Sequence, residues 1–212
     1  MSMPAAARAA IKAVIFDIGG ILEPPFDDVL FADLAGMLGM PEPRLRQHRA
    51  ADAVALTEGR MTLRDFYARV VGESGRPVDP DAAVARHLAV YGAATTRLDA
   101  RVLGLIQELR RRHVVACLTN TEVEVGRFNR ERGLFGPFDR AFLSTELGLH
   151  KPGRAIFERV LAELGCSPPE AVFTDDKLEN AAGARAVNMH AIHYRDFEGF
   201  SRELAQLVEP GA

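Results

Sequence analysis

The stretch Ala13-Val14-Ile15-Phe16-Asp17-Ile18-Gly19-Gly20 is an apolar run that ends on one carboxylate and two glycines. The run is too short for a typical helix, and three successive positions in it are β-branched or aromatic. A continuous rather than alternating apolar run predicts a strand that is covered on both faces. In an open parallel sheet, ligands bind beyond the carboxyl ends of the strands, where Asp17 would lie. Taken alone, Asp17 fits a simple turn equally well, so the rest of the chain has to decide.

The second half of the chain alternates strand-like and helix-like segments. Further strands are predicted at 114–118, 140–143, 171–174 and 190–194, and helices at 102–109, from Pro152 to Gly165 and at 200–208. Thr121 with Glu124, and Asp176 with Glu179, have capping-box spacing before two more helices. Five strands linked by helices predict an α/β fold, a doubly wound parallel sheet with right-handed crossovers.

The first connection is the exception to this regular alternation. A crossover between parallel strands needs on the order of a dozen or two residues, and the segment that follows the first strand is several times longer. Apolar residues recur in it at helical spacing, and Thr62 with Asp65 forms a further candidate capping box. We therefore predict a small inserted α-helical cap at 23–95, with the α/β core formed by 1–22 and 96–212.

Composition restricts the class of protein. The net charge of -3 over 212 residues offers no Lys/Arg excess for a phosphate backbone, so no nucleic-acid partner is expected. No apolar stretch approaches the roughly twenty residues that span a bilayer, and no membrane partner is expected. The Ala-rich segment Met1 to Ala10 is interrupted by Arg8, and we expect no signal peptide. Cys117 and Cys166 form no disulfide framework, which favours a reducing cytoplasm.

Polar groups follow three of the predicted strands at the same edge of the sheet. These are Asp17, Thr119-Asn120 and Asp175-Asp176, and a loop before a later helix adds Lys151. A carboxylate nucleophile that attacks a phosphoryl group is repelled by its target. A metal ion, a fixed cation and hydrogen-bond donors remove that repulsion. The set is therefore chemically coherent as a phosphoryl-transfer site.

The residue types suggest a division of labour within this set. Asp17, Asp176 and the Gly19 carbonyl are oxygen donors of the kind that Mg²⁺ prefers. Gly19 also permits close backbone approach to a phosphate. Thr119 and Asn120 are candidate phosphate-binding residues at a helix N-terminus, and Lys151 would both bind phosphate and neutralise charge in the transition state.

The segments Asp17-Ile18-Gly19-Gly20, Leu118-Thr119-Asn120, Lys151-Pro152 and Asp175-Asp176 with Asn180 resemble the four ordered motifs of the haloacid dehalogenase (HAD) superfamily. The helical insert resembles the cap of its sugar phosphate phosphatases and of the phosphatase domain of soluble epoxide hydrolases. The resemblance implies a hydrolase of small phosphorylated metabolites that uses Mg²⁺ and an aspartyl-phosphate intermediate on Asp17. It also implies that Asp176 is a direct metal ligand and that Asp175 is an additional one, direct or through water.

The sequence departs from the phosphatase pattern at Gly19, where these enzymes usually carry an Asp that protonates the leaving group and activates water. Such help is commonly worth about 10²–10⁴ in rate. Three explanations stay open: Glu23 or His150 acts in its place, the substrate has a good leaving group such as an anomeric phosphate, or turnover is slow.

Two alternative functions follow from the same residues. A 2-haloacid dehalogenase would use the Asp nucleophile on carbon, although it needs neither a metal nor a paired acidic motif. A phosphate-binding or regulatory protein with low turnover would keep the site without the acid–base Asp. Monomer and homodimer both fit the sequence, and no motif in it names the substrate.

Overall fold

Strand β1 (Ala13–Phe16) lies in the middle of a parallel sheet. The computed structural model describes residues 9–208, and within this range the sheet has five strands in the order β3-β2-β1-β4-β5. The other strands are β2 (Val114–Thr119), β3 (Arg140–Leu143), β4 (Ala171–Asp175) and β5 (His190–His193). The neighbouring pairs are all parallel, which confirms the predicted α/β class.

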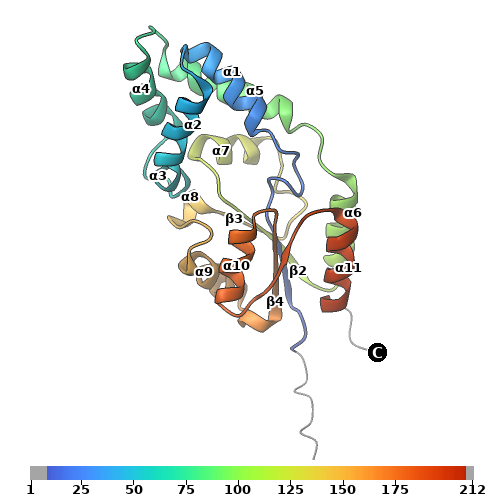
Figure 1. Ribbon diagram of the computed structural model, residues 1–212. Coiled ribbons are helices and arrows are strands. Elements are labelled where there is room, and N and C mark those ends of the chain that lie inside the picture. Colours follow the sequence, from blue (N-terminus) through green and yellow to red (C-terminus); the bar gives the residue numbers. More distant parts are fainter. Residues whose placement is uncertain (1–8, 209–212) are drawn as a thin grey trace, which may run out of the picture.

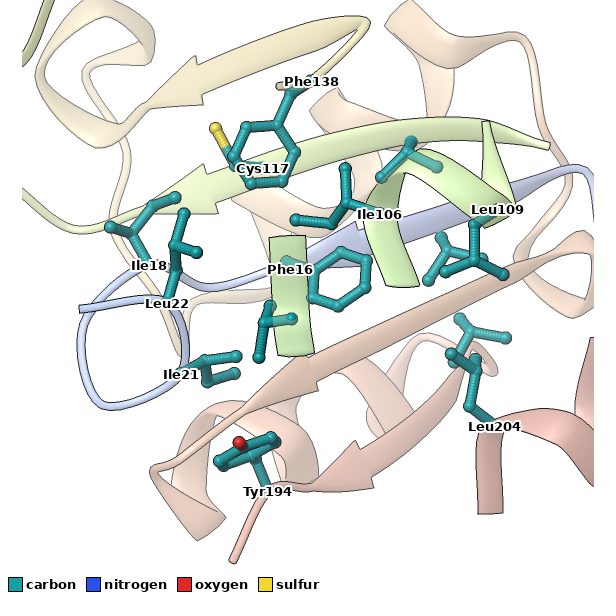
Figure 2. Close-up of a cluster of buried hydrophobic side chains, with 14 of the residues drawn as sticks. Phe16, Ile18, Ile21, Leu22, Ile106, Leu109, Cys117, Phe138, Tyr194 and Leu204 are labelled. Carbon is teal, nitrogen blue, oxygen red and sulfur yellow. The ribbon is translucent and has the colours of Figure 1, made fainter. Parts of the chain in front are cut away.

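Helices cover both faces of the sheet, as the continuous apolar run predicted. Because neighbouring strand residues point to opposite faces, Val14 and Phe16 join one apolar cluster while Ala13 and Ile15 join the other. Figure 1 shows α6 (Ala100–Leu109) and α11 (Phe197–Val208) on one side and α9 (Arg154–Leu164) and α10 (Leu178–Ala186) on the other. Figure 2 shows Phe16 among the side chains of the α6 and α11 face. Both faces of β1 are therefore sealed from water.

The segment after β1 forms a layer of helices above the carboxyl edge of the sheet (Figure 1). These helices are α1 (Asp27–Leu38), α2 (Glu42–Ala51), α3 (Ala53–Thr57), α4 (Leu63–Ser74) and α5 (Pro80–Ala94). They enclose an apolar core of their own, to which Val125 of α7 (Val123–Glu131) also contributes. The predicted capping box between Thr62 and Asp65 is confirmed at the start of α4. The division into a core at 1–22 and 96–212 and a cap at 23–95 stays a prediction. Residues 1–8 and 209–212 lie outside the described range, and with them most of the segment Met1 to Ala10, for which no signal peptide is expected.

Three predicted helix starts were wrong. Helix α9 begins at Arg154 after Gly153, so Pro152 precedes the helix instead of occupying its first turn. Helix α7 begins at Val123, and its N-terminus has no side-chain cap from Thr121. The backbone N–H of Thr121 instead donates to Ser144 Oγ at 3.0 Å, at the start of the short helix α8 (Ser144–Leu147).

Helix α10 follows the same pattern. It begins at Leu178 with Lys177 at the N-cap position, without a side-chain cap from Asp176. The Lys177 N–H donates to Asp175 Oδ1 at 2.9 Å. Glu124, assigned by its spacing to a cap of its own helix, instead accepts the N–H of Leu63 at 3.1 Å at the start of α4. These polar residues serve contacts between elements, which local spacing does not encode.

The remaining described residues add little that bears on the site. A short 3₁₀ helix, η1 (Pro168–Glu170), precedes β4. Both cysteines, Cys117 and Cys166, are free thiols. Among the helices within residues 9–208, none combines the length and the apolar character that crossing a membrane requires.

Packing inside the cap is tested by a pair of identical truncations. Val70 on α4 is fully buried in the cap cluster, whereas Val29 on α1 is 60% exposed. We expect Val70→Ala to lower the free energy of unfolding by about 2 kcal/mol, since two buried carbons and a cavity are involved. Val29→Ala should change it by less than about 0.5 kcal/mol in the same urea titration. Equal effects would contradict the assignment of Val70 to a packed cap core.

Candidate active site

Asp17 follows β1 at the carboxyl edge of the sheet and is held there by backbone hydrogen bonds. Its N–H donates to the Thr174 carbonyl of β4 at 2.9 Å. The chain then turns back at once, because the N–H groups of Leu22 and Glu23 both donate to the Ile18 carbonyl, at 2.9 and 3.0 Å. This turn leaves the Asp17 side chain facing a cavity beyond the strand ends.

The two glycines in this turn differ in whether the structure requires glycine at their position. Gly20 has φ +71°, and a Cβ there would lie 2.5 Å from a carboxylate oxygen of Asp176. Only glycine fits such a position. Gly19 is not in the left-handed region, and a Cβ there would meet nothing within 4 Å. A side chain at position 19 is therefore sterically acceptable, and the missing acid is not forced by the backbone.

Lys151 joins the ends of three strands. Its Nζ lies 2.9 Å from Asp17 Oδ1 and donates to Asp175 Oδ2 at 2.7 Å and to the Leu118 carbonyl at 2.9 Å. The residue is only 3% exposed, so its charge is satisfied by protein groups rather than by water. The three protons of the ammonium group thus have one acceptor each. Lys151 is a fixed cation beside Asp17.

Neighbouring residues hold Lys151 in place. Asn120 pairs with its backbone in both directions, donating from Nδ2 to the Lys151 carbonyl at 2.9 Å and accepting the Lys151 N–H on Oδ1 at 2.9 Å. Asp175 is fully buried behind the cavity, and its Oδ1 accepts from Asn180 Nδ2 and from the Lys177 N–H, both at 2.9 Å. Asn120 and Asp175 therefore orient the lysine from two sides.

Three carboxylates gather around this one lysine. Asp17, Asp175 and Asp176 each offer an oxygen, and these oxygens lie within 4.8 Å of one another. Burial raises the pKa of Asp17 to about 6, although the Lys151 charge opposes the shift. Burial and then the Asp175 charge raise the pKa of Asp176 as well. Burial alone would lower the pKa of Lys151, but Asp17 and Asp175 raise it overall.

This cluster fits a divalent cation. Three ionised carboxylates and one lysine leave an excess of two negative charges in a partly dehydrated site, which the raised carboxyl pKa values reflect. Carboxylate oxygens at such separations suit a hard cation such as Mg²⁺. The donor set thus matches the metal that the sequence motifs imply.

The predicted phosphate-binding residues lie at the same edge. Thr119 ends β2 and lines the cavity together with Asp17, Gly19, Asn120, Lys151 and Asp176. The structure thus brings together the predicted site residues, with Asp175 just behind the cavity wall. Ser144, fully buried under Thr121, was missed because a lone serine at the start of a short helix carries no recognisable spacing.

The two candidates for a replacement acid are both engaged elsewhere. Glu23 accepts from Tyr91 Oη at 2.8 Å on one carboxylate oxygen and forms an ion pair with Arg132 through the other. His150 Nδ1 lies 2.8 Å from Glu58 Oε1, between a core loop and the cap. Both residues line the cavity, but their polar atoms tie the cap to the core.

The cavity has a volume of about 630 Å³ and runs from Asp17 up between the cap helices. Further contacts close the cap over it, including the ion pair between Arg49 and Glu122. Asp17 and Thr119 at the strand ends are buried in this form, which strengthens electrostatic interactions around them.

A parallel sheet with an acid after its first strand, a lysine and an acidic pair at neighbouring strand ends, and an inserted helical cap defines a capped α/β hydrolase. The sequence matches the haloacid dehalogenase-like hydrolases over residues 11–188. The chain belongs to this family.

Relatives and solved structures agree with this assignment. The sesquiterpene phosphatase astK of Aspergillus oryzae is 30% identical over 204 residues, covering 93% of this chain and 96% of its own. A D-ribitol-5-phosphate phosphatase of Bacteroides thetaiotaomicron is 26% identical over 179 residues, covering 80% and 85%. A HAD family enzyme of the same bacterium, solved with magnesium and inorganic phosphate, has a TM-score of 0.75 at 20% identity, covering 90% and 99%.

Metal binding at the acidic cluster is testable without any assay of activity. Mg²⁺ at one hundred times its Kd should raise the Tm by about 5–10 °C, because the ion binds the folded state. Asp176→Asn should remove most of this shift, whereas Asp81→Asn on the exposed surface of α5 should keep it. A full Mg²⁺ shift in Asp176→Asn, measured by calorimetry, would rule out this site.

Proposed function

We propose that this hydrolase is a Mg²⁺-dependent phosphatase of small phosphorylated metabolites that works through an aspartyl-phosphate on Asp17. The observation that carries the proposal is the Lys151 ammonium group, held between Asp17 and Asp175 beside an acidic cluster of metal-ligand geometry. An isolated buried acid would be a poor nucleophile toward an anion. Here a fixed cation touches the same carboxylate.

Each residue then has a role that follows from its position. Asp17 attacks phosphorus, the ester bond breaks, and water later hydrolyses the acyl phosphate. Lys151 offsets charge on the transferring group, and Thr119 with the backbone near Gly19 and Asn120 binds phosphate oxygens. Asp175 positions Lys151 through the 2.7 Å hydrogen bond.

The metal would be held by Asp17, Asp176 and the Gly19 carbonyl. Asp175 contributes charge to this site, and the three donors that its carboxylate already accepts favour a role through water. When bound, Mg²⁺ offsets the negative charge of the phosphate as the carboxylate approaches.

Two features of the comparisons and the site support phosphate transfer over dehalogenation. Both relatives are named as phosphatases, and the match to astK covers 93% of this chain, enough by length to include all four motifs. A dehalogenase has no use for the Asp175-Asp176 pair, whereas a phosphatase does. The relatives agree on a phosphate ester but differ in the organic part, a sesquiterpene in one and a polyol in the other.

A phosphate-binding protein with little turnover is the second candidate, favoured by one observation. Position 19 has no acid, and Glu23 and His150 are engaged in contacts between cap and core. For the protein to act as a phosphatase, its substrate must have a leaving group that departs with help from water alone.

The nucleophile is tested by one isosteric change. Asp17→Asn should lower Mg²⁺-dependent phosphate release by roughly 10⁴-fold or more, since the attacking oxygen is lost. Asp81→Asn should keep the wild-type rate, and EDTA should abolish that rate. Phosphate release that persists in Asp17→Asn contradicts the proposal, and chloride release from 2-haloacids in EDTA would favour the dehalogenase.

The missing acid is tested at Gly19. Because the position is open, Gly19→Asp should fold normally and raise kcat for alkyl phosphates by about 10²–10⁴, the usual contribution of a general acid. The gain should be much smaller for p-nitrophenyl phosphate, whose leaving group needs no proton. Gly19→Asn, which adds equal bulk without an acid, serves as the control. A gain equal for both substrates, or equal in the Asn variant, would show that acid catalysis is not what position 19 lacks.

A further inference from the structure

The cavity above Asp17 changes character along its depth. At the sheet edge its wall consists of carboxylates, amides and Lys151. Toward the cap the wall becomes aliphatic and aromatic, with contributions from four helices. The side chains that dominate this part are Leu30, Phe31 and Leu34 of α1, Leu45 of α2, Val54 of α3 and Phe66 of α4.

The polar groups in the cap wall are paired with one another. Tyr67 Oη and His87 Nδ1 share a hydrogen bond of 2.8 Å, and both residues are buried. Burial lowers the pKa of His87 to about 4, so the ring is neutral at pH 7. Tyr91 Oη is likewise bonded to Glu23 and to Asn129. The hydroxyls of Tyr67 and Tyr91 and the Nδ1 atom of His87 thus already have hydrogen-bond partners within the protein.

The two arginines in the wall are also committed. Arg49 forms an ion pair with Glu122. Arg46 is paired with Asp28 and Glu42, both at 2.8 Å, and its guanidinium lies 4.4 Å from the Phe31 ring centroid. Both arginines on this wall therefore have carboxylate partners within the protein.

A polyol and a hydrocarbon would meet this wall very differently. Each hydroxyl buried against it would lose its water without gaining a partner, which is costly. A hydrocarbon has no hydrogen bonds to water to lose, and its transfer out of water is favourable in free energy. The volume of about 630 Å³ lies within the ~300–1,000 Å³ of pockets that enclose most of a drug-sized ligand.

We propose that the substrate is the phosphate ester of an apolar alcohol, with the phosphate at Asp17 and the hydrocarbon chain between α1, α2 and α4. This rests on the proposed phosphatase function and names its substrate class. Attack by the Asp17 carboxylate breaks the bond between phosphorus and the ester oxygen, and the departing alcohol takes its proton from water. A second water then releases inorganic phosphate and restores the carboxylate.

The test is a homologous series of straight-chain alkyl phosphates from butyl to dodecyl, kept below their critical micelle concentrations, with ribitol 5-phosphate and glycerol 3-phosphate as polar counterparts. We expect kcat/KM to rise about fourfold per added methylene until the cavity is filled. Activity with p-nitrophenyl phosphate reports on the phosphatase function separately. A rate independent of chain length, or polyol phosphates as the better substrates, would overturn the substrate class while leaving the phosphatase intact.

A cavity-filling variant localises the effect. Ala53 of α3 lines the cavity and is half-buried, so Ala53→Phe should lower the ratio of kcat/KM for dodecyl over butyl phosphate by about tenfold or more. Ala32→Phe, an equal change at an exposed position of α1 outside the cavity, should leave the ratio unchanged. An unchanged ratio in Ala53→Phe, with the fold intact by circular dichroism, would show that the hydrocarbon chain of the substrate does not bind in this cavity.

Binding to Asp17→Asn separates the two proposals fully. Titration calorimetry with the same alkyl phosphates and Mg²⁺ should show Kd falling with chain length even though this variant does not turn over. If the wild type hydrolyses no phosphate but the Kd still falls with length, the phosphatase function fails and the apolar ligand class stands. A Kd that does not depend on length would overturn the ligand class.

Discussion

The structure depends on one buried ammonium group placed between two buried carboxylates. Removing Lys151 from water is costly, and the cost is offset only because three acceptors are in position for its three protons. Those acceptors come from the ends of β1, β2 and β4, which are adjacent in the sheet. The strand order thus brings the proposed nucleophile, Asp17, into contact with a fixed cation.

The cap completes what the sheet edge begins. Its helices supply the apolar upper wall of the cavity, while polar links such as Glu23 to Arg132 and Glu58 to His150 join it to the core. These links engage Glu23 and His150, the two residues that the sequence offered as replacement acids. The absence of an acid at position 19 is not imposed by sterics, because the backbone there has room for a side chain. It therefore bears on the chemistry of the site.

Local patterns were reliable where burial dominates and misleading where polar residues act over long distances. Apolar runs located the strands closely, since a strand covered on both faces tolerates few polar positions. The starts of α7, α9 and α10 were placed wrongly. At α7 and α10 the supposed capping residues lie among contacts with distant elements, as when Thr121 binds Ser144 and Glu124 receives the N–H of Leu63. Spacing along the chain carries no record of such partners.

By itself, the sequence determined the class of the sheet, the order of its chemical groups and the presence of a helical insert. Each of these follows from periodicity or from residues placed directly after an apolar run. Only the tertiary structure decided that Asp175 orients Lys151 from behind the cavity, that Glu23 is held by Tyr91 and Arg132, and that the cap presents an apolar wall. The reason is physical: which face of a helix lines a cavity, and which acid remains free, depends on partners tens of residues away, and folding alone brings them together.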